Sequence, residues 1–222
     1  MWGYCAMNRE EYLLENLAKI KEEISPSVTL IVVSKTYPIS DIEILYRAGV
    51  RDFGENRDSE GDLKSKALPS DINWHFQGQI QSNKLKSILS WARYIHSLDD
   101  LSHAKKMNRI LEKPKEVFIQ VNLDGQPHRG GVSPEDLLDL VEHVFELPMV
   151  KPIGLMAVAP LGLDPNISFA NLASIKSGIS REFPSITYIS AGMSGDFREA
   201  IAHGATHVRI GSSILGSREQ II

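Results

Sequence analysis

The chain has very few of the features that would tie it to a membrane, a nucleic acid or an oxidising compartment. Its single cysteine, Cys5, excludes an internal disulfide and fits a reducing compartment. No apolar run approaches the roughly 18–20 residues that cross a bilayer, and residues 1–4 lack the charged and apolar regions of a signal peptide. The net charge is −4 with no block of Lys or Arg, which argues against nucleic acid as a partner. We therefore expect a cytoplasmic protein.

Signature motifs of metal, hydrolase and dinucleotide sites are also missing. The sequence contains no H-E-x-x-H, no Cys/His cluster and no carboxylate array of the kind that holds a metal ion. Neither Ser194 nor Ser212 stands in a G-x-S-x-G elbow, and Gly192 and Gly195 do not belong to a G-x-G-x-x-G opening. The sequence therefore supports neither a metal centre nor a dinucleotide site.

What the chain does contain is an ordinary globular composition. It has 222 residues, of which 42% are hydrophobic and 23% are charged, and a chain of this length buries a core of ample size. No linker, repeat or low-complexity tract divides it. We expect residues 1–222 to form a single domain.

Short apolar runs alternate with amphipathic segments almost from end to end. The predicted strands are Thr29–Ser34, Val50–Phe53, Ile72–Phe76, Tyr94–His96, Val117–Asn122, Lys151–Val158, Ile186–Ser190 and His207–Ile210. The predicted helices between them are Ser40–Ala48, Asn56–Leu68, Ser82–Trp91, Asp99–Leu111, Ser133–Leu147, Asn166–Phe183 and Gly195–His203, and a further helix over Asn8–Glu23 precedes the first strand.

This alternation predicts right-handed βαβ units and a parallel sheet. The strand count favours a closed (β/α)8 TIM barrel with an extra N-terminal helix, and the chain length is within the usual range of that fold. An open doubly wound sheet is the main alternative.

Lys35 ends the most β-like apolar run of the chain, residues 28–35. At the end of the first barrel strand, its long side chain would reach the barrel mouth, where (β/α)8 barrels carry out their chemistry. An amine at this place can attack a carbonyl group and form a Schiff base. The alternative is a lysine that only snorkels from a solvated rim.

Two turns rich in Gly and Ser, at residues 192–195 and 211–213, follow the seventh and eighth predicted strands. TIM barrels often bind phosphate at these two loops, because glycine lets the backbone approach an anion and a following helix points its N–H groups at it. Ser194, Ser212 and Ser213 add hydroxyl donors. Each turn alone could be an ordinary strand-to-helix connection, but the pair together with Lys35 indicates a phosphorylated carbonyl compound, which is the chemistry of pyridoxal phosphate.

Three further polar residues are candidates for this site. Arg209 alternates with Val208 and Ile210 on the last strand, so it is expected to face the barrel interior, where it would keep a pyridine nitrogen unprotonated; a buried structural ion pair is the alternative. Asn56 and His75 are plausible neighbours of a cofactor ring. Equally, Asn56 could cap a helix and His75 could be a satisfied core histidine.

With these residues assembled, the sequence resembles the YggS/PROSC family of pyridoxal phosphate homeostasis proteins over essentially its whole length. The resemblance is carried by Val32-Val33-Ser34-Lys35-Thr36, Phe53-Gly54-Glu55-Asn56, Trp74-His75-Phe76-Gln77-Gly78-Gln79-Ile80-Gln81-Ser82-Asn83-Lys84, Gly154-Leu155-Met156-Ala157, Gly192-Met193-Ser194 with Asp196, and Val208-Arg209-Ile210-Gly211. Gln77, Ile80 and Ala191 depart from the expected pattern, and Gln77 is the one that could alter the pocket lining.

The resemblance implies a role for each of several residues. It implies that Lys35 carries pyridoxal 5′-phosphate as a Schiff base and that Arg209 faces the pyridine nitrogen. It also implies that Ser194, Gly211 and Ser212 hold the phosphate, and that Asn56 lines the ring.

The expected function is storage, buffering or delivery of the cofactor without catalytic turnover. Related racemases use a separate β-domain, which supplies a second acid/base residue, because racemisation needs proton transfer on both faces of a carbanion. This chain ends at Ile222 with no room for that domain, so we expect a monomer that passes the cofactor to apo forms of pyridoxal phosphate-dependent enzymes.

Two other functions are open at this point. One is a single-domain amino-acid racemase in which Tyr37 or His75 serves as the acid opposite Lys35. The other is a plain (β/α)8 binder of a different phosphorylated metabolite.

Overall fold

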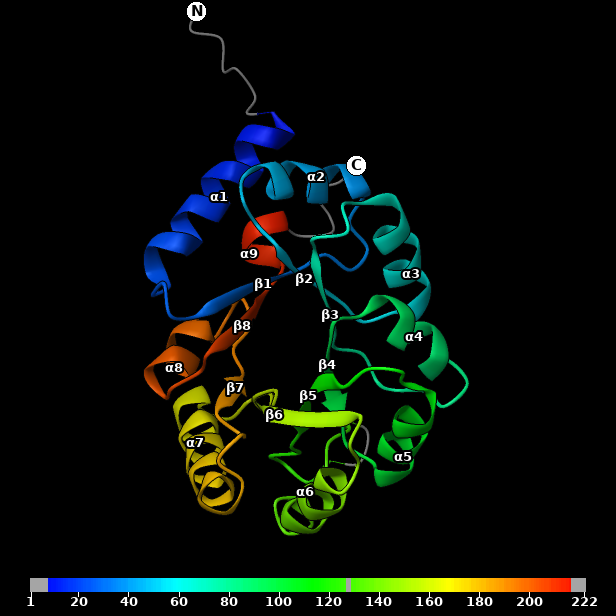
Figure 1. The fold of residues 1–222 in the computed structure, drawn as a ribbon. Coiled ribbons are helices and arrows are strands. Elements are labelled where there is room, and N and C mark those ends of the chain that lie inside the picture. The colour runs from blue at the N-terminus through cyan, green and yellow to red at the C-terminus, as the bar shows by residue number, and fades with distance from the viewer. Residues whose placement is uncertain (1–7, 127–128, 217–222) are drawn as a thin grey trace, which may run out of the picture.

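Within the described residues, eight parallel strands close into a barrel at the centre of the molecule (Figure 1). The computed structural model describes residues 8–126 and 129–216. Neighbours in the chain are neighbours in the sheet, and β8 pairs with β1 to complete the ring. The strands are β1 Thr29–Val33, β2 Asp52–Glu55, β3 Asn73–Phe76, β4 Tyr94–Leu98, β5 Lys115–Gln120, β6 Val150–Met156, β7 Tyr188–Ser190 and β8 His207–Ile210.

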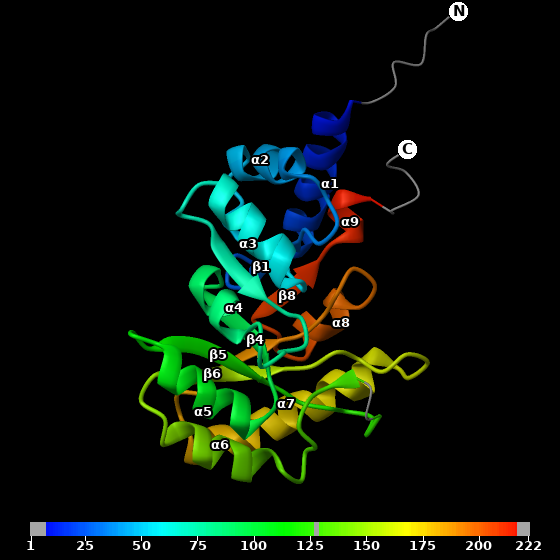
Figure 2. The same cartoon turned by 90° about the vertical axis from the view of Figure 1, so that its right-hand side faces the viewer.

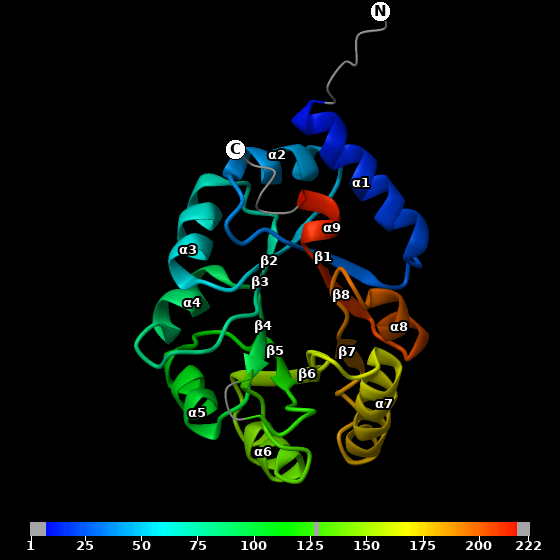
Figure 3. The ribbon, with the colours of Figure 1, turned by 180° about the vertical axis from the view of Figure 1, so that it is seen from behind.

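A ring of helices surrounds the barrel, as Figures 1 and 3 show from opposite sides. They are α1 Arg9–Glu23, α2 Ile39–Arg47, α3 Asp58–Ala67, α4 Leu85–Trp91, α5 Leu101–Ile110, α6 Leu137–Phe145, α7 Pro165–Glu182, α8 Phe197–Ala202 and α9 Ser212–Leu215. The prediction of a (β/α)8 TIM barrel with an additional N-terminal helix is therefore confirmed, and the open doubly wound sheet is wrong.

The two faces of the sheet bury different kinds of side chain. Because side chains alternate along a strand, Val208 and Ile210 pack in the large apolar layer between sheet and helices, together with Val32 of β1. The barrel interior is more polar: Arg209 lies between Val208 and Ile210 and faces inwards, where it hydrogen-bonds to Ser190 of β7. The sheet thus separates an apolar outer core from a partly polar inner one.

Helix α1 packs against α2 and α9, and it buries an apolar stripe at helical spacing, Leu13, Leu17 and Ile20. A capping box at Asn8 begins the helix. Polar side chains then join it to α9, which lies beside it (Figure 2): Asn16 Nδ2 donates to the carbonyl oxygen of Ile214 at 3.2 Å. Residues near both ends of the sequence therefore pack together.

Several predicted boundaries are wrong by two or more residues. β2 begins at Asp52 rather than Val50, because the Val50 N–H bonds back to Leu45 in the turn after α2. Strand β5 begins at Lys115 rather than Val117, because a charged residue does not match the apolar pattern from which the strand was predicted. Helix α6 begins at Leu137 because Ser133 Oγ accepts the N–H of Asp136 in a separate turn. The short helix α9 was not predicted.

Gly154 of β6 gives a test of how tightly the sheet is packed. A Cβ atom there would lie 2.4 Å from the Tyr188 carbonyl oxygen and 2.8 Å from Phe118 Cε1, so Gly154→Ala should lower the unfolding free energy by about 1–3 kcal/mol. Gly178 of α7 has no atom within 4 Å of a Cβ, and Gly178→Ala should raise it by about 0.5–1 kcal/mol. Urea unfolding of both variants measures the difference, and equal effects would contradict this packing.

Candidate functional site

A cavity of about 530 Å³ opens at the carboxyl ends of the strands. In a (β/α)8 barrel this end is the one that carries functional sites. The residues that line the cavity come from six of the strand-to-helix connections and strand ends: Val33, Lys35, Tyr37, Asn56, Gln77, Met156, Val158, Met193, Ser194, Gly195, Arg209, Gly211, Ser212 and Gly216. Six of the seven residues that the sequence selected are among them.

Lys35 lies two residues beyond the end of β1 and lines the cavity with a half-buried side chain. Among the described residues, its amine takes part in no hydrogen bond or ion pair. The residues on either side of it are held firmly by the neighbouring element α3. An amine left without a protein partner on a fixed backbone is available to a ligand.

Ser34, directly before Lys35, is fixed by a buried ion pair. Its hydroxyl donates to Glu55 Oε1 at 2.8 Å, and Lys64 Nζ donates both to the same oxygen at 2.7 Å and to the Ser34 carbonyl at 2.8 Å. Burial raises the pKa of Glu55, and the charge of Lys64 opposes the shift. The pair therefore joins the ends of β1 and β2 to α3.

Thr36, directly after Lys35, adopts a left-handed backbone conformation with φ of 69°. A β-branched residue avoids this region, so the surroundings must hold it there. Its N–H donates to Glu60 Oε2 at 2.6 Å, and the hydroxyl of Tyr37 donates to the carbonyl oxygen of Gly216. Strain of this kind concentrates at functional sites, and here it sets the direction of the Lys35 side chain.

The two Gly/Ser turns, which follow β7 and β8, meet in the same cavity wall beside β1. Gly192 has φ of +89°, and a Cβ there would lie 2.7 Å from Ala200 Cβ, so only glycine fits the first turn. Ser194 Oγ accepts the N–H of Ser213 at 3.2 Å, which joins the turn after β7 to the turn after β8. Ser194, Gly211 and Ser212 consequently form one polar edge of the cavity.

Arg209 forms part of the cavity wall, although its side chain is almost fully buried. Its Nη1 donates to the Ser190 carbonyl at 2.6 Å and to Ser190 Oγ at 2.9 Å, and its Nη2 donates to the Ala157 carbonyl at 2.9 Å. Burial lowers the pKa of Arg209 to about 10, while the charge of Asp196 opposes the shift. The guanidinium therefore remains a cation at neutral pH, and the ion pairs between described residues do not include it.

The structure decides between the alternatives for Asn56 and His75. Asn56 lines the cavity, and Arg57 rather than Asn56 is the N-cap of α3. His75 is not among the residues that line the cavity: its ring is buried in the barrel and hydrogen-bonds to Asp52 and His96, as the alternative of a satisfied core histidine describes. Gln77, two residues further along the same strand face, lines the cavity instead.

Sequence reasoning also missed the apolar part of the lining, Met156, Val158 and Met193. Methionine and valine carry no chemical signal that separates a cavity wall from a core. The amide Nε2 of Gln77 is buried without a hydrogen-bond partner in the described part of the chain. Only its departure from the expected family pattern pointed to Gln77.

Comparison with known proteins assigns the family. A model of the alanine racemase N-terminal domain matches residues 10–219. The pyridoxal phosphate homeostasis protein of Synechocystis sp. is 41% identical over 90% of this chain and 96% of its own length, and that of Corynebacterium glutamicum is 40% identical over 86% and 91%. The chain belongs to the pyridoxal phosphate homeostasis protein family.

Solved structures of other proteins agree with the fold. PipY of Synechococcus elongatus, determined without pyridoxal phosphate, superposes with a TM-score of 0.88 at 36% identity over 92% of this chain and 100% of PipY. PipY with pyridoxal phosphate bound gives 0.85 over the same shares. Alanine racemase of Clostridium difficile, at 16% identity, has a TM-score of 0.79 and shares the fold over 58% of its length.

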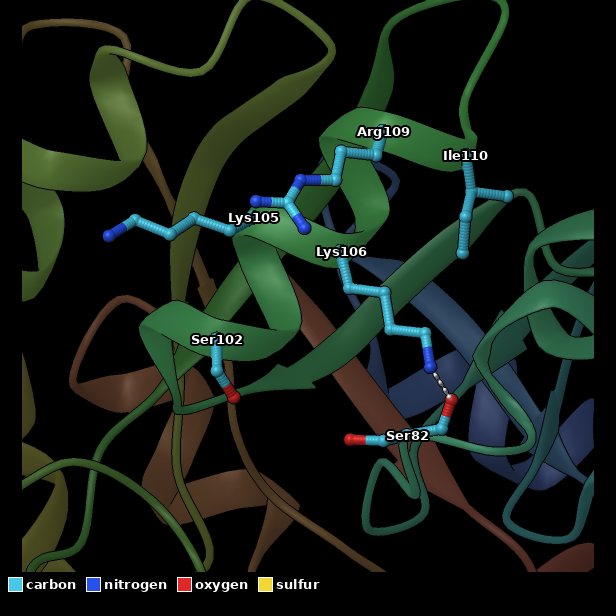
Figure 4. Close-up of a pocket in the computed structure, with 6 residues that line it drawn as sticks. All are labelled: Ser82, Ser102, Lys105, Lys106, Arg109 and Ile110. Carbon is cyan, nitrogen blue, oxygen red and sulfur yellow. Dashed lines mark hydrogen bonds between the residues drawn. The ribbon is translucent and has the colours of Figure 1, made fainter.

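A second cavity, separate from the one at the barrel mouth, lies beside α5 (Figure 4). Ser82, Ser102, Lys105, Lys106, Arg109 and Ile110 line it. Lys106 extends towards Ser82 and donates to its carbonyl oxygen at 2.7 Å, while Lys105 and Arg109 extend elsewhere. None of the residues selected from the sequence lies here.

Among the described residues, no group of His, Cys, Asp and Glu could hold a metal ion, and no helix is long and apolar enough to span a membrane.

The buried Glu55–Lys64 pair that supports Lys35 can be tested through stability. Lys64→Met leaves the carboxylate buried and unpaired, which should lower the unfolding free energy by about 3–5 kcal/mol. Lys66, on the same helix, pairs with Asp62 at the surface and is 73% exposed, so Lys66→Met should change it by about 0.5 kcal/mol or less. Denaturant unfolding at neutral pH separates the two, and a stable Lys64→Met variant would contradict the role given to the pair.

Proposed function

We propose that this chain binds pyridoxal 5′-phosphate at the barrel mouth and serves in the homeostasis of that cofactor. The observation that carries the proposal is the arrangement of one cavity: the amine of Lys35, which has no partner among the described residues, shares this cavity with the polar edge formed by Ser194, Gly211 and Ser212. The names of its relatives and the pyridoxal phosphate bound to PipY support it.

The residues present suit this compound. When bound, pyridoxal phosphate supplies an aldehyde that condenses with a lysine amine, which places Lys35 at the carbonyl end. Hydroxyl groups and backbone at Ser194, Gly211 and Ser212 suit the phosphate. A Cβ at Gly211 would lie 3.2 Å from the Val33 carbonyl, so glycine allows this turn to lie close against β1.

Arg209 and Asn56 would complete the site around the ring. The guanidinium gives some of its N–H groups to Ser190 and Ala157, and the remaining ones are available to an acceptor in the cavity. A charged arginine donating to a pyridine nitrogen keeps that nitrogen unprotonated and makes the ring a weak electron sink. Arg209 therefore favours holding the cofactor over using it in catalysis.

We infer that the chain stores, buffers or delivers the cofactor without turning over a substrate. Among the described lining residues, Lys35, Tyr37 and Arg209 are the titratable ones. The hydroxyl proton of Tyr37 is engaged by the Gly216 carbonyl, and His75 is directed away from the cavity towards Asp52 and His96. An amino-acid racemase needs a second acid/base group opposite the lysine, and this lining offers none that is free to act.

The cellular role can be proposed on the same grounds. We propose that the protein is a single-domain monomer of the cytoplasm that transfers pyridoxal phosphate to apo forms of enzymes that use it. The homeostasis role in the names of its relatives supports a function of this kind.

The covalent link is tested by trapping. Borohydride reduction of the protein with pyridoxal phosphate should fix a pyridoxyl group on Lys35, because its amine is the one in the cavity, and Lys35→Ala should abolish that adduct. Lys106→Ala, which changes a lysine of the second cavity, should leave it unchanged. Peptide mass spectrometry locates the group, and an adduct that persists on another lysine in Lys35→Ala would contradict the assignment.

The absence of turnover is tested by proton exchange. Alanine and serine, incubated in deuterium oxide with the cofactor-loaded protein, should lose their α-protons no faster than with free pyridoxal phosphate. Proton NMR follows the α-proton signal. Exchange well above the rate of the free cofactor, and lost in Lys35→Ala, would instead establish a racemase-like activity.

A further inference from the structure

A continuous chain of hydrogen bonds crosses the barrel interior from the cavity wall to the opposite end. Arg209 Nη1 is 2.9 Å from Ser190 Oγ, which is 2.9 Å from His96 Nδ1. His96 Nε2 is 2.9 Å from His75 Nδ1, and His75 Nε2 is 3.0 Å from Asp52 Oδ1. Asp52 is the first residue of β2, so it lies at the amino end of the strands, whereas the cavity lies at their carboxyl ends.

The chemistry of the groups allows only one direction of donation. A guanidinium has donors and no acceptor, so Ser190 Oγ accepts from Arg209 and can still donate its own proton to His96 Nδ1. His96 then carries its proton on Nε2 and donates to His75 Nδ1. His75 in turn carries its proton on Nε2 and donates to the carboxylate of Asp52. The carboxylate can only accept, so with neutral rings the Asp52 end fixes this direction, and the Arg209 end is compatible with it.

Both imidazole rings are held in place and kept neutral. His96 stacks on Phe118 with ring centres 4.2 Å apart, and His75 stacks on Tyr94 at 4.7 Å. Burial lowers the pKa of His96 well below its usual value, and the positive charge of Arg209 lowers it further. Burial also lowers the pKa of His75, while its bond to Asp52 opposes that shift. Neutral rings can donate on one side and accept on the other, as the chain requires.

The chain also accounts for a buried charge. Arg209 is 4% exposed and has no carboxylate partner in the described ion pairs. Leaving a buried cation uncompensated is costly. Aligned hydrogen bonds polarise one another in a low-dielectric interior. The hydrogen-bond chain therefore couples the positive charge of Arg209 to the negative charge of Asp52, which is 25% exposed.

We propose that Ser190, His96, His75 and Asp52 are positioning residues that hold the Arg209 guanidinium in its orientation at the cavity wall. They are not among the residues that line the cavity, and they act through Arg209. The proposal rests on the proposed function, because the ring nitrogen of pyridoxal phosphate is the group that Arg209 would meet. It assigns a role to interior residues that the site alone leaves unexplained.

One test needs no ligand. In the full-length protein at neutral pH, nitrogen-15 NMR of the imidazole rings, assigned with the variants His75→Gln and His96→Gln, should show both rings neutral with the proton on Nε2. A proton on Nδ1 of either ring, or a doubly protonated ring, would contradict the proposed hydrogen-bond chain.

A second test uses pyridoxal phosphate and breaks the chain at each end. Ser190→Ala removes the group next to Arg209, and Asp52→Leu removes the remote acceptor; each should weaken affinity about three- to tenfold and shift the visible absorption band of the bound ligand in the same direction. Asp52→Asn keeps an acceptor oxygen and should restore both properties. Asp71→Leu changes another carboxylate that precedes β3 at the same end of the barrel and should match the wild type.

The double variant separates a chain from independent structural damage. Because one break already disconnects the chain, Asp52→Leu with Ser190→Ala should bind no more weakly than Ser190→Ala alone. Wild-type affinity and spectrum in Asp52→Leu, or full multiplication of the two losses in the double variant, would overturn the proposal. Borohydride should still fix the ligand on Lys35 in every variant. Failure of the wild type to form that adduct would contradict the proposed function. The ligand-free NMR experiment would then test the hydrogen-bond chain on its own.

Discussion

The pairing of β8 with β1 is the contact on which the rest of the structure depends. Thr29 to Val32 align with His207 to Ile210, and this closure places the residues after β1 beside those after β8. Lys35 thereby shares a cavity with Gly211 and Ser212, although they are far apart in the sequence. In an open sheet, the first and last strands would lie at different edges and the amine would not meet the Gly/Ser turns.

The interior that results is unusually polar for a closed barrel of this size. Small barrels normally fill their centre with branched apolar side chains, and Ile31 and Phe118 do so here. The buried histidines, Ser190 and Arg209 occupy the remaining space. Polar groups without partners would destabilise such a core, but each of these side chains has a hydrogen-bond partner. These hydrogen-bonded polar side chains therefore hold the cavity wall in place from beneath.

The sequence predicted the fold and six of the residues that line the cavity, because both depend on local patterns. Apolar runs alternating with amphipathic segments determine a parallel barrel, and the carboxyl ends of its strands determine where Lys35, Ser194 and Arg209 gather. Side-chain depth was not predictable in this way. His75 and Gln77 share a strand face, and periodicity alone does not say which of the two reaches the cavity. The long-range bonds of His75 to other strands settle the question, and no local pattern reports them.

The contact between α1 and α9 bears on how the protein acquires its binding ability during synthesis. Arg9 donates to the carbonyl of Leu215, at the far end of the described chain. Lys35 leaves the ribosome well before Arg209, Gly211 and Ser212, which follow it in the sequence. Distant contacts of this kind form late, after the entropy of closing long loops has been overcome. A nascent chain therefore exposes Lys35 long before Gly211 and Ser212 can lie beside it, and the cavity that these residues share forms only after β8 has joined β1.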